Sequence, residues 1–344
     1  MRVLVFRLSS LGDVILSTSF LAKLPADAEV DWVVSREFEF VLKGHPGIRN
    51  LIVFDKKTGL GGWFRLIREL AAREYDCRVD LHRTLRTALA FAWFRIFAGG
   101  RILRVSKERA RSFLLFALKG FLPRALRPSP WWRRFAQLAA KLQASSAGEP
   151  LPPDFTHLLK RKPGEAEALL ERYGLESGRF YSVMPSSRWQ TKEWGVDRFF
   201  EVVRTLRTKG RVPLLLGRET DAAARALRAR LEQAGIPFRD ALKEPDFGNT
   251  AILLKHSAFY IGCDTGLSHL AEAVGCPAFV IFGPTRPELG FGPARPASRA
   301  ITAPVACSPC SKDGRHCFRF TDPHACMTRI GSSRVSEEIS RCGF

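Results

Sequence analysis

Residues 1–24, MRVLVFRLSSLGDVILSTSFLAKL, contain the unit from which the fold is built. An apolar run at 2–8 predicts a buried strand, and the apolar spacing over 13–24 predicts a helix. A short polar turn joins them, containing Gly12 and ending at Asp13. A strand that leads directly into a helix is the repeating unit of a parallel sheet. The turn is therefore expected at the carboxyl edge of that sheet, where α/β proteins bind their ligands.

Strands and helices alternate along the rest of the chain. In the first half, strands are predicted at 30–35, 50–55 and 77–82 and helices at 37–43, 62–75 and from about residue 85. The alternation restarts with strands at 180–185, 212–217, 258–264 and 277–283 and helices at 164–175, 195–210, 219–235, 247–257, 266–275 and after 331–333. Such alternation favours an α/β fold with parallel sheets.

The length of 344 residues exceeds what one ordinary core accommodates, so two domains are expected. The stretch 145–155, rich in Pro and small residues, is the predicted linker between them. The sequence thus predicts two Rossmann-like domains, 1–155 and 156–344, that face a central cleft at the carboxyl ends of their strands.

Composition is that of a globular protein, with 46% hydrophobic residues and no apolar run long enough to cross a membrane. The amino terminus lacks the pattern of a cleaved leader. The eight cysteines are too sparse for a disulfide scaffold and suit thiols in a reducing compartment. A cytoplasmic protein is expected.

The net charge of +20 is concentrated in one stretch. Residues 82–134 hold 13 Lys or Arg side chains and one acidic residue, Glu108, interleaved with aromatics that include Trp131 and Trp132. Basic residues mixed with aromatics suit an anionic surface, such as phospholipid headgroups, a phosphorylated lipid or nucleic acid. An ordinary solvated face above a packed core is the alternative interpretation.

The segment IGCDTGLSHLAEAVGCP (261–277) is a candidate phosphate site. A predicted strand ends at Asp264, and Thr265 and Gly266 open a helix that carries His269 in its first turn. The amides and the dipole of a helix N-terminus attract phosphate. In the alternative interpretation, Asp264 or Thr265 only caps the helix and His269 belongs to the core.

The segment MPSSRWQTKEW (184–194) has the matching position after another strand. Its hydroxyls and cations can hold a diphosphate without a metal, because Lys192 supplies the positive charge. A polar loop above a packed Trp is the simpler alternative.

Five segments together resemble glycosyltransferase family 9, the heptosyltransferases of the lipopolysaccharide inner core. The first is the opening segment, with Ser9, Ser10, Gly12 and Asp13; the others are DLHRTLRTALA (80–90), TKEW (191–194), DTGLSHLAEAVGCPAFVIFGPT (264–285) and the Cys-rich CSPC segment with its two later cysteines (307–327). The Cys-rich segment is similar to that of the heptosyltransferase II branch. The resemblance spans nearly the whole chain.

The resemblance implies a GT-B fold and metal-independent, inverting transfer of heptose from ADP-heptose. The implied donor-binding residues are Ser186, Ser187, Thr191, Lys192, Glu219, Asp264, Thr265, Gly266 and His269, with Asp221 as an alternative to Glu219 for the ribose. The implied acceptor-binding residues are Ser9, Ser10, Gly12, Asp80, Arg83 and Arg86. An ion pair of Asp80 with these arginines is the structural alternative.

Asp13 and Lys192 are the expected catalytic residues. An inverting transfer needs a base that removes the proton of the acceptor hydroxyl, and Asp13 is the candidate. A helix N-terminus lowers the pKa of a carboxylate, which makes it a weaker base. Lys192 would stabilise the charge on departing ADP. A simple helix cap is the alternative role for Asp13.

The expected partners are a nucleotide-sugar donor and an anionic lipopolysaccharide precursor in the inner leaflet, with peripheral contact at the inner face of the inner membrane. No nucleic-acid partner, cofactor or catalytic metal is expected. The C-x2-C-x6-C-x8-C spacing of Cys307, Cys310, Cys317 and Cys326 leaves a structural metal open. The competing functions are transfer of another sugar, a protein acceptor, or a non-catalytic module that binds membrane or nucleic acid.

Overall fold

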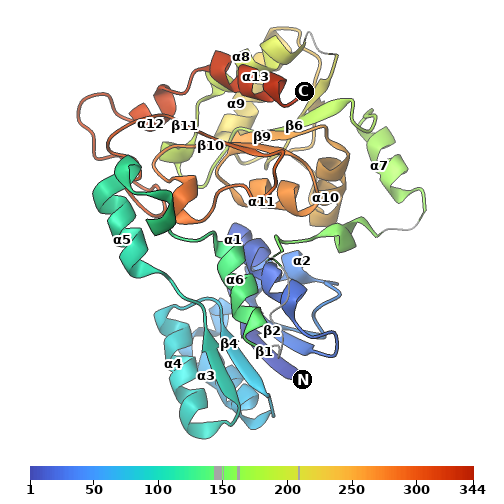
Figure 1. Cartoon of the computed structure of the whole chain (residues 1–344). Coiled ribbons are helices and arrows are strands. Elements are labelled where there is room, and N and C mark those ends of the chain that lie inside the picture. The colour runs from blue at the N-terminus through green and yellow to red at the C-terminus, as the bar shows by residue number, and fades with distance from the viewer. Residues whose placement is uncertain (143–148, 150, 161–162, 208–209) are drawn as a thin grey trace. The chain divides into compact units, whose positions relative to one another are not determined.

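The computed structural model describes residues 1–142, 149, 151–160, 163–207 and 210–344 (Figure 1). The chain forms two compact units, one of residues 1–107 with 131–157 and one of residues 108–130 with 158–344. The crossing at 157/158 lies close to the predicted boundary at 155/156. Residues 108–130, predicted in the first domain, belong instead to the second unit. The predicted linker at 145–155 lies partly outside the described residues.

The first unit contains a five-stranded parallel sheet in the order β3-β2-β1-β4-β5. Its strands are β1 (Arg2–Phe6), β2 (Glu29–Ser35), β3 (Asn50–Phe54), β4 (Cys77–Asp80) and β5 (Arg101–Arg104). Helices α3 (Gly59–Ala72) and α4 (Leu85–Phe97) cover one face, and α1 (Leu11–Ser17), α2 (Glu39–Leu42) and α6 (Trp131–Ala140) cover the other. Leu4 and Phe6 of β1 pack against Trp63 and Phe94 in the core of the first face.

The second unit contains a six-stranded parallel sheet in the order β11-β10-β9-β6-β7-β8. Its strands are β6 (Phe180–Met184), β7 (Val212–Leu215), β8 (Arg239–Asp240), β9 (Tyr260–Cys263), β10 (Ala278–Phe282) and β11 (Arg299–Thr302). Helices α8 (Val196–Leu206), α9 (Ala222–Gln233) and α13 (Ser332–Arg341) lie on one face, and α10 (Phe247–His256) and α11 (Gly266–Ala273) on the other (Figure 1). The unit also contains α5 (Arg109–Leu118), α7 (Glu165–Arg172) and α12 (Ala325–Thr328).

Both sheets reverse their strand order beside their first strand. In the first unit β1 lies between β2 and β4, and in the second β6 lies between β7 and β9. In each sheet, the chain therefore leaves the two strands at this reversal in opposite directions, β1 and β4 in the first sheet and β6 and β9 in the second, and open α/β sheets bind their ligands at such a point. This topology brings together the turns after β1 and β4 in one unit, and the turns after β6 and β9 in the other.

The first helix is shorter than predicted. It ends at Ser17 and continues as a 3₁₀ helix over Thr18–Lys23. The hydroxyls of Ser17, Thr18 and Ser19 each donate to the carbonyl three residues earlier, at 2.7, 2.7 and 2.8 Å. Such bonds compete with the α-helical pattern and favour the tighter turn.

No described helix is long and apolar enough to cross a membrane.

Candidate functional site

Asp13 lies in the first turn of α1, directly beyond the carboxyl end of β1. Ser10 is the N-cap, and Asp13 at the third helical position completes a capping box by accepting from the Ser10 amide and hydroxyl at 3.4 and 2.9 Å. The other carboxylate oxygen forms an ion pair with Arg7 at 2.7 Å. Ser9 and Gly12 are half-buried in the same turn. The cap and the candidate base are thus the same carboxylate.

The surroundings of Asp13 act in opposite directions on its pKa. Burial raises the pKa of the carboxyl, while Arg7, the two Ser10 hydrogen bonds and His82 lower it. The lowering contributions prevail, so the pKa lies below its ordinary value. The carboxylate is therefore ionised at neutral pH, and a quarter of its side chain remains exposed.

His82 is the titratable neighbour that sequence reasoning missed. It follows β4, and the guanidinium of Arg7 links the two strand ends by donating to the Leu81 carbonyl at 2.7 Å. Burial, then Arg7, lower the pKa of His82 to about 3, so its imidazole is neutral near pH 7. Its Nδ1 atom is buried without a hydrogen-bond partner. In the sequence, the only sign of this role is that His82 ends the strand predicted at 77–82. The structure places that strand beside β1.

Asp80 holds the β4–α4 turn together. Its fully buried carboxylate accepts from the amides of His82 and Arg83 at 3.0 and 2.7 Å and from the Thr87 hydroxyl at 3.2 Å. Among the described residues, the ion-pair partner of this carboxylate is Arg104, at 3.1 Å, and not Arg83 or Arg86 as the structural alternative proposed. These contacts favour the structural role that the sequence had left open.

The two arginines predicted to bind acceptor also contact the protein itself. The Arg83 guanidinium donates to the Val105 carbonyl at 3.0 Å. Arg86 lies over the rings of Phe54 and Trp63, 5.4 and 5.8 Å from their centroids. Both side chains are half-buried, so each can still present part of its guanidinium to a ligand.

In the second unit the turns after β6 and β9 meet through Lys192 and Asp264. The Lys192 ammonium lies 2.6 Å from the Asp264 carboxylate, which also accepts from the Thr285 hydroxyl at 2.9 Å. The side chains of Lys192 and Asp264 are only 14% and 11% exposed. An ammonium has three donors, so Lys192 retains two for an anion beside Asp264. Thr285, after β10, was not among the predicted residues.

The serines after β6 differ in their surroundings. Ser186 is buried, and its hydroxyl has no hydrogen-bond partner. The Ser187 amide donates to the Glu193 carboxylate at 3.1 Å. Burial, opposed by that amide, raises the pKa of Glu193 above its ordinary value. A buried hydroxyl is normally hydrogen-bonded, so the Ser186 hydroxyl is a candidate donor to a bound ligand.

Gly314 of the Cys-rich segment contacts both Thr191 and Lys192. The Thr191 hydroxyl donates to the Gly314 carbonyl. Gly314 has a φ of +75°, and a Cβ built on it would lie 2.8 Å from Lys192 Cγ and 2.9 Å from Pro284 Cγ. Only glycine therefore lets the backbone lie against the stem of Lys192.

Helix α11 presents its N-terminus at the same edge. Thr265 is its N-cap without a side-chain capping bond, and its hydroxyl lies 3.4 Å from the hydroxyl of Tyr260. Gly266 begins the helix, leaving its first amides for an anion. His269 is buried, with its ring centroid 6.4 Å from that of Phe291. The burial of His269 agrees with its structural alternative, and binding of the donor by His269 stays a prediction.

Neither candidate for the ribose is unpaired. Glu219 forms an ion pair with Arg228 at 3.0 Å, and Arg228 also bonds Asp240. Asp221 accepts from the amide and the guanidinium of Arg218 at 3.0 and 3.1 Å. The choice between the two carboxylates stays open.

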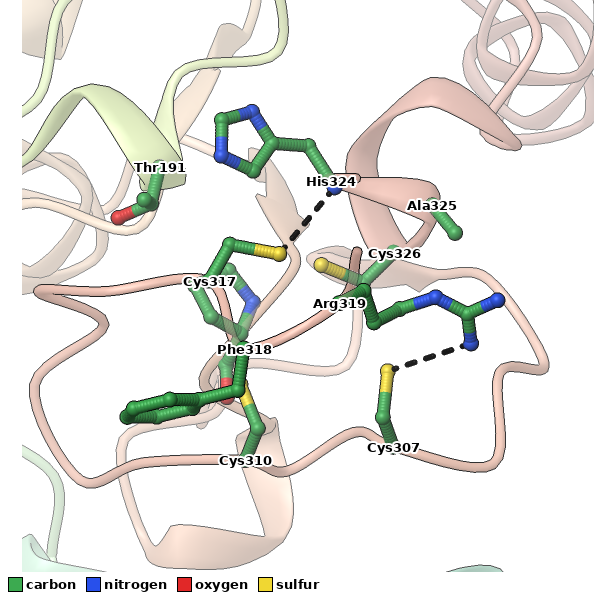
Figure 2. A pocket seen from close by; sticks show the side chains of 10 residues that line it. Thr191, Cys307, Cys310, Cys317, Phe318, Arg319, His324, Ala325 and Cys326 are labelled. Atoms are coloured by element: carbon green, nitrogen blue, oxygen red, sulfur yellow. Dashed lines mark hydrogen bonds between the residues drawn. The ribbon is translucent and has the colours of Figure 1, made fainter. Parts of the chain in front are cut away.

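The four cysteines of the Cys-rich segment line one cavity of about 110 Å³, together with Thr191, Arg319 and His324 (Figure 2). All four are free thiols. Cys317 accepts from the His324 amide at 3.3 Å, and Arg319 lies 4.0 Å from the sulfur of Cys307. Among the described residues no group of three or more His, Cys, Asp or Glu side chains is arranged to hold a metal ion.

Curated relatives match nearly the full chain. This chain is 27% identical over 367 residues to lipopolysaccharide heptosyltransferase 1 of Pseudomonas aeruginosa, with 98% of this chain and 97% of the relative covered. It is 25% identical over 327 residues to the enzyme of that name from Escherichia coli K12, with 87% and 94% covered.

The fold is also that of a solved heptosyltransferase. The structure described as Escherichia coli ADP-heptose lps heptosyltransferase II superposes with a TM-score of 0.73 at 20% identity, covering 99% of this chain and 98% of that one. The architecture is therefore GT-B. The matching curated relatives are named heptosyltransferase 1 and 3, so the expected place in the heptosyltransferase II branch stays a prediction.

A sequence model of glycosyltransferase family 9 (heptosyltransferase) matches residues 63–317, about three quarters of the chain. This match agrees with the two parallel sheets and with the polar side chains gathered at their switch points. The protein is a glycosyltransferase that belongs to family 9, the heptosyltransferases.

Proposed function

We propose that this glycosyltransferase moves heptose from ADP-heptose to the inner core of lipopolysaccharide. The observation that carries the proposal is the cluster of Lys192, Asp264 and Thr285 beside the N-terminus of α11. An ammonium with spare donors and the amides of a helix N-terminus suit a diphosphate. The names of the curated relatives support heptose and lipopolysaccharide as the substrates.

The transfer is proposed to invert the anomeric centre. The acceptor hydroxyl oxygen bonds to the anomeric carbon from the face opposite ADP, and the bond from that carbon to the diphosphate oxygen breaks. ADP departs with the electron pair, and Asp13 takes the proton of the hydroxyl. The ionised state of Asp13 supports this role, whereas its lowered pKa limits its strength as a base.

Charge on the departing ADP is proposed to be stabilised by Lys192, by the hydroxyl of Ser186 and by the amides of Thr265 and Gly266. Preorganised donors aimed at developing charge are often the largest contribution to catalysis. Ser186 supports this assignment, because its buried hydroxyl lacks a partner that a phosphate oxygen would supply.

The protein is proposed to work without a metal, at the inner face of the inner membrane, in peripheral contact with its anionic lipid acceptor. We expect turnover to persist in EDTA, because Lys192 supplies the positive charge at the diphosphate. The measurement is initial rate across an EDTA series. Full inhibition that Mg²⁺ or Mn²⁺ reverses would contradict this part of the proposal.

The test of the function is incubation with ADP-heptose and a set of core-truncated lipopolysaccharide precursors, followed by mass spectrometry of the lipid. We expect one heptose added to an acceptor and equimolar release of ADP. Lys192→Ala is the companion variant, expected to weaken ADP binding and to slow transfer. Transfer of a different sugar, or to protein alone, would overturn the assignment of substrates.

A further inference from the structure

Helix α5 exposes an apolar stripe along its length. Six exposed apolar positions of the helix and the following turn recur at the spacing of one helical face: Ala110, Phe113, Leu114, Ala117, Leu118 and Phe121. Arg109 and Arg111 are exposed beside them. Phe113, Leu118 and Phe121 are 71%, 45% and 93% exposed. Single exposed apolar residues are ordinary, whereas a contiguous row marks a surface that binds something.

The opposite side of the helix already anchors it to the second unit. Leu115 is 1% exposed and, with Leu122, forms a small core with Leu289. Phe116 and Phe291 pack against that core. Figure 1 shows α5 at the margin of this unit. The helix therefore has a packing face of its own, and its apolar stripe contributes nothing to that core.

Positive charge borders the stripe. Residues 108–127, which include α5 and the turns that follow it, contain one acidic residue, Glu108. Their basic residues are Arg109, Arg111, Lys119, Arg124 and Arg127. Glu108 lies 3.8 Å from Arg111, and Arg127 is paired with Glu288. Arg109, Lys119 and Arg124 form no ion pair with another described residue. The charge complements an anionic surface.

The aromatic pair Trp131 and Trp132 belongs to the stretch that was predicted to suit an anionic surface, but it is not fully exposed. Trp132 is buried in the first unit, where its carbonyl accepts from Ser19 at 2.7 Å. Arg134 is buried as well, under the ring of Trp131. Trp132 and Arg134 therefore face inward. The exposed large apolar side chains of the stretch 82–134 lie on α4, with Ile96 and Phe97 among them, and on α5 with its following turns. Of the two helices, α5 is the one with two exposed phenylalanines, Phe113 and Phe121, in its row.

We propose that α5 is a membrane-docking helix: its row of Phe, Leu and Ala side chains enters the headgroup boundary of an anionic bilayer, and the flanking cations bind lipid phosphates. The inference rests on the proposed lipid acceptor and assigns the contact to the unit that carries Lys192. An apolar face bordered by Arg and Lys is the pattern of helices that lie in a membrane interface. A surface that binds a second copy of this basic chain would place cations against cations.

The test is co-sedimentation of the full chain with phosphatidylcholine vesicles, with and without phosphatidylglycerol, in a salt series and without substrates. We expect binding only with phosphatidylglycerol, weakened by salt. The triple variant Phe113→Ser, Leu118→Ser and Phe121→Ser should lower partitioning by about tenfold or more, because each removed side chain loses its own transfer free energy. Arg109→Ser with Arg124→Ser should reduce the salt dependence.

The matched control is Ile96→Ser with Phe97→Ser, which removes two exposed apolar side chains from α4 of the first unit. It should bind vesicles like the wild type. Loss of binding in this control with retention in the triple variant would overturn the assignment to α5, as would equal binding to neutral and anionic vesicles. A wild-type dimer in sedimentation velocity that the triple variant converts to monomer, with vesicle binding unchanged, would show that a second copy covers the stripe.

Two further readouts separate this inference from the proposed function. ADP affinity and transfer to acceptor dispersed in detergent should be unchanged in the triple variant, since α5 carries none of the proposed substrate-binding residues. A protein that docks on anionic vesicles but transfers no heptose would refute the proposed function alone. A protein that transfers heptose and does not dock would refute the inference alone.

Discussion

The carboxylate of Asp13 is a helix cap by its contacts, and the proposed role of base would fall to the same group. Its carboxylate closes the capping box with Ser10 and also pairs with Arg7. These contacts hold the side chain in one orientation at the end of β1 and keep it ionised. A positioned carboxylate of low pKa depends on geometry more than on basicity for proton transfer.

We expect Asp13→Asn to lower turnover by about 10²–10⁴-fold while ADP affinity stays near that of the wild type, since the general base is lost and the diphosphate site lies in the other unit. Steady-state kinetics and calorimetric titration of ADP measure the two effects. Asp55→Asn is the control, because it weakens a cap at the end of β3 in the same unit, worth about 1 kcal/mol, and is expected to cause little loss of rate. Near-normal turnover of Asp13→Asn would leave Asp13 as a cap and direct attention to His82.

Gly314 illustrates a residue whose role depends wholly on the folded structure. We expect Gly314→Ala to displace the stem of Lys192 and weaken ADP binding by roughly tenfold, because the new methyl group would overlap Lys192 and Pro284. Gly178→Ala is the matched control, with a similar φ of +73° and nothing within 4 Å. Equal ADP affinity in both variants would mean that the Cys-rich segment does not position Lys192.

The candidate site was predictable where strand ends mark it. Asp13, Lys192 and Asp264 follow buried strands, and in the second sheet the neighbouring positions of β6 and β9 bring the ends that carry Lys192 and Asp264 together. The partners of Asp80 and Arg86 were not predictable, because Arg104 and Phe54 lie far from them along the chain. His82 was missed for the same reason, since its importance arises from contact between the ends of β1 and β4.

Among the elements, strands with long apolar runs were predicted and short edge strands were missed. Strands β5, β8 and β11 have sequences RILR, RD and RAIT and lie at the edges of their sheets. Edge strands bury little surface, so their hydrophobic pattern is weak. Helix α5 escaped prediction because the strand before it, β5, was missed, and α6 escaped because it follows other helical segments rather than a strand.

Glu272 of α11 binds the loop that follows β10. Its buried carboxylate accepts from the amide of Ala294 at 2.9 Å and from that of Arg295 at 2.9 Å. We expect Glu272→Gln to lower the free energy of unfolding by about 1–3 kcal/mol, because one buried amide loses its acceptor. Urea unfolding measures it. Glu201→Gln, which breaks an exposed pair with Arg204, should change stability by less than about 1 kcal/mol; a comparable loss in both would contradict a special role for Glu272.

At the scale of the whole molecule, buried histidines make stability depend on pH. Burial, then neighbouring charge, lower the pKa of His45 to about 4 and that of His82 to about 3. Unfolded histidine binds a proton near pH 6.5, so below that value the unfolded state holds more protons than the folded state. Stability therefore falls as pH drops from about 6.5 toward 4.

We expect the midpoint of urea unfolding to decrease between pH 7 and pH 5, and the decrease to be smaller in the double variant His45→Gln and His82→Gln. Fluorescence at a series of pH values measures both midpoints. The double variant can be less stable at every pH without affecting the comparison, since only the slope against pH carries the argument. An unchanged slope in the double variant would assign the dependence to other groups.

The chain passes between its two units at 107/108, 130/131 and 157/158. No single cut can therefore release either unit intact. A fragment that begins at residue 158 would lack Leu115 and Leu122 and would expose Leu289 and the adjoining Phe291 to water. Separate study of the second unit needs residues 108–130 supplied with it, joined to the new amino terminus by a linker or added as a peptide.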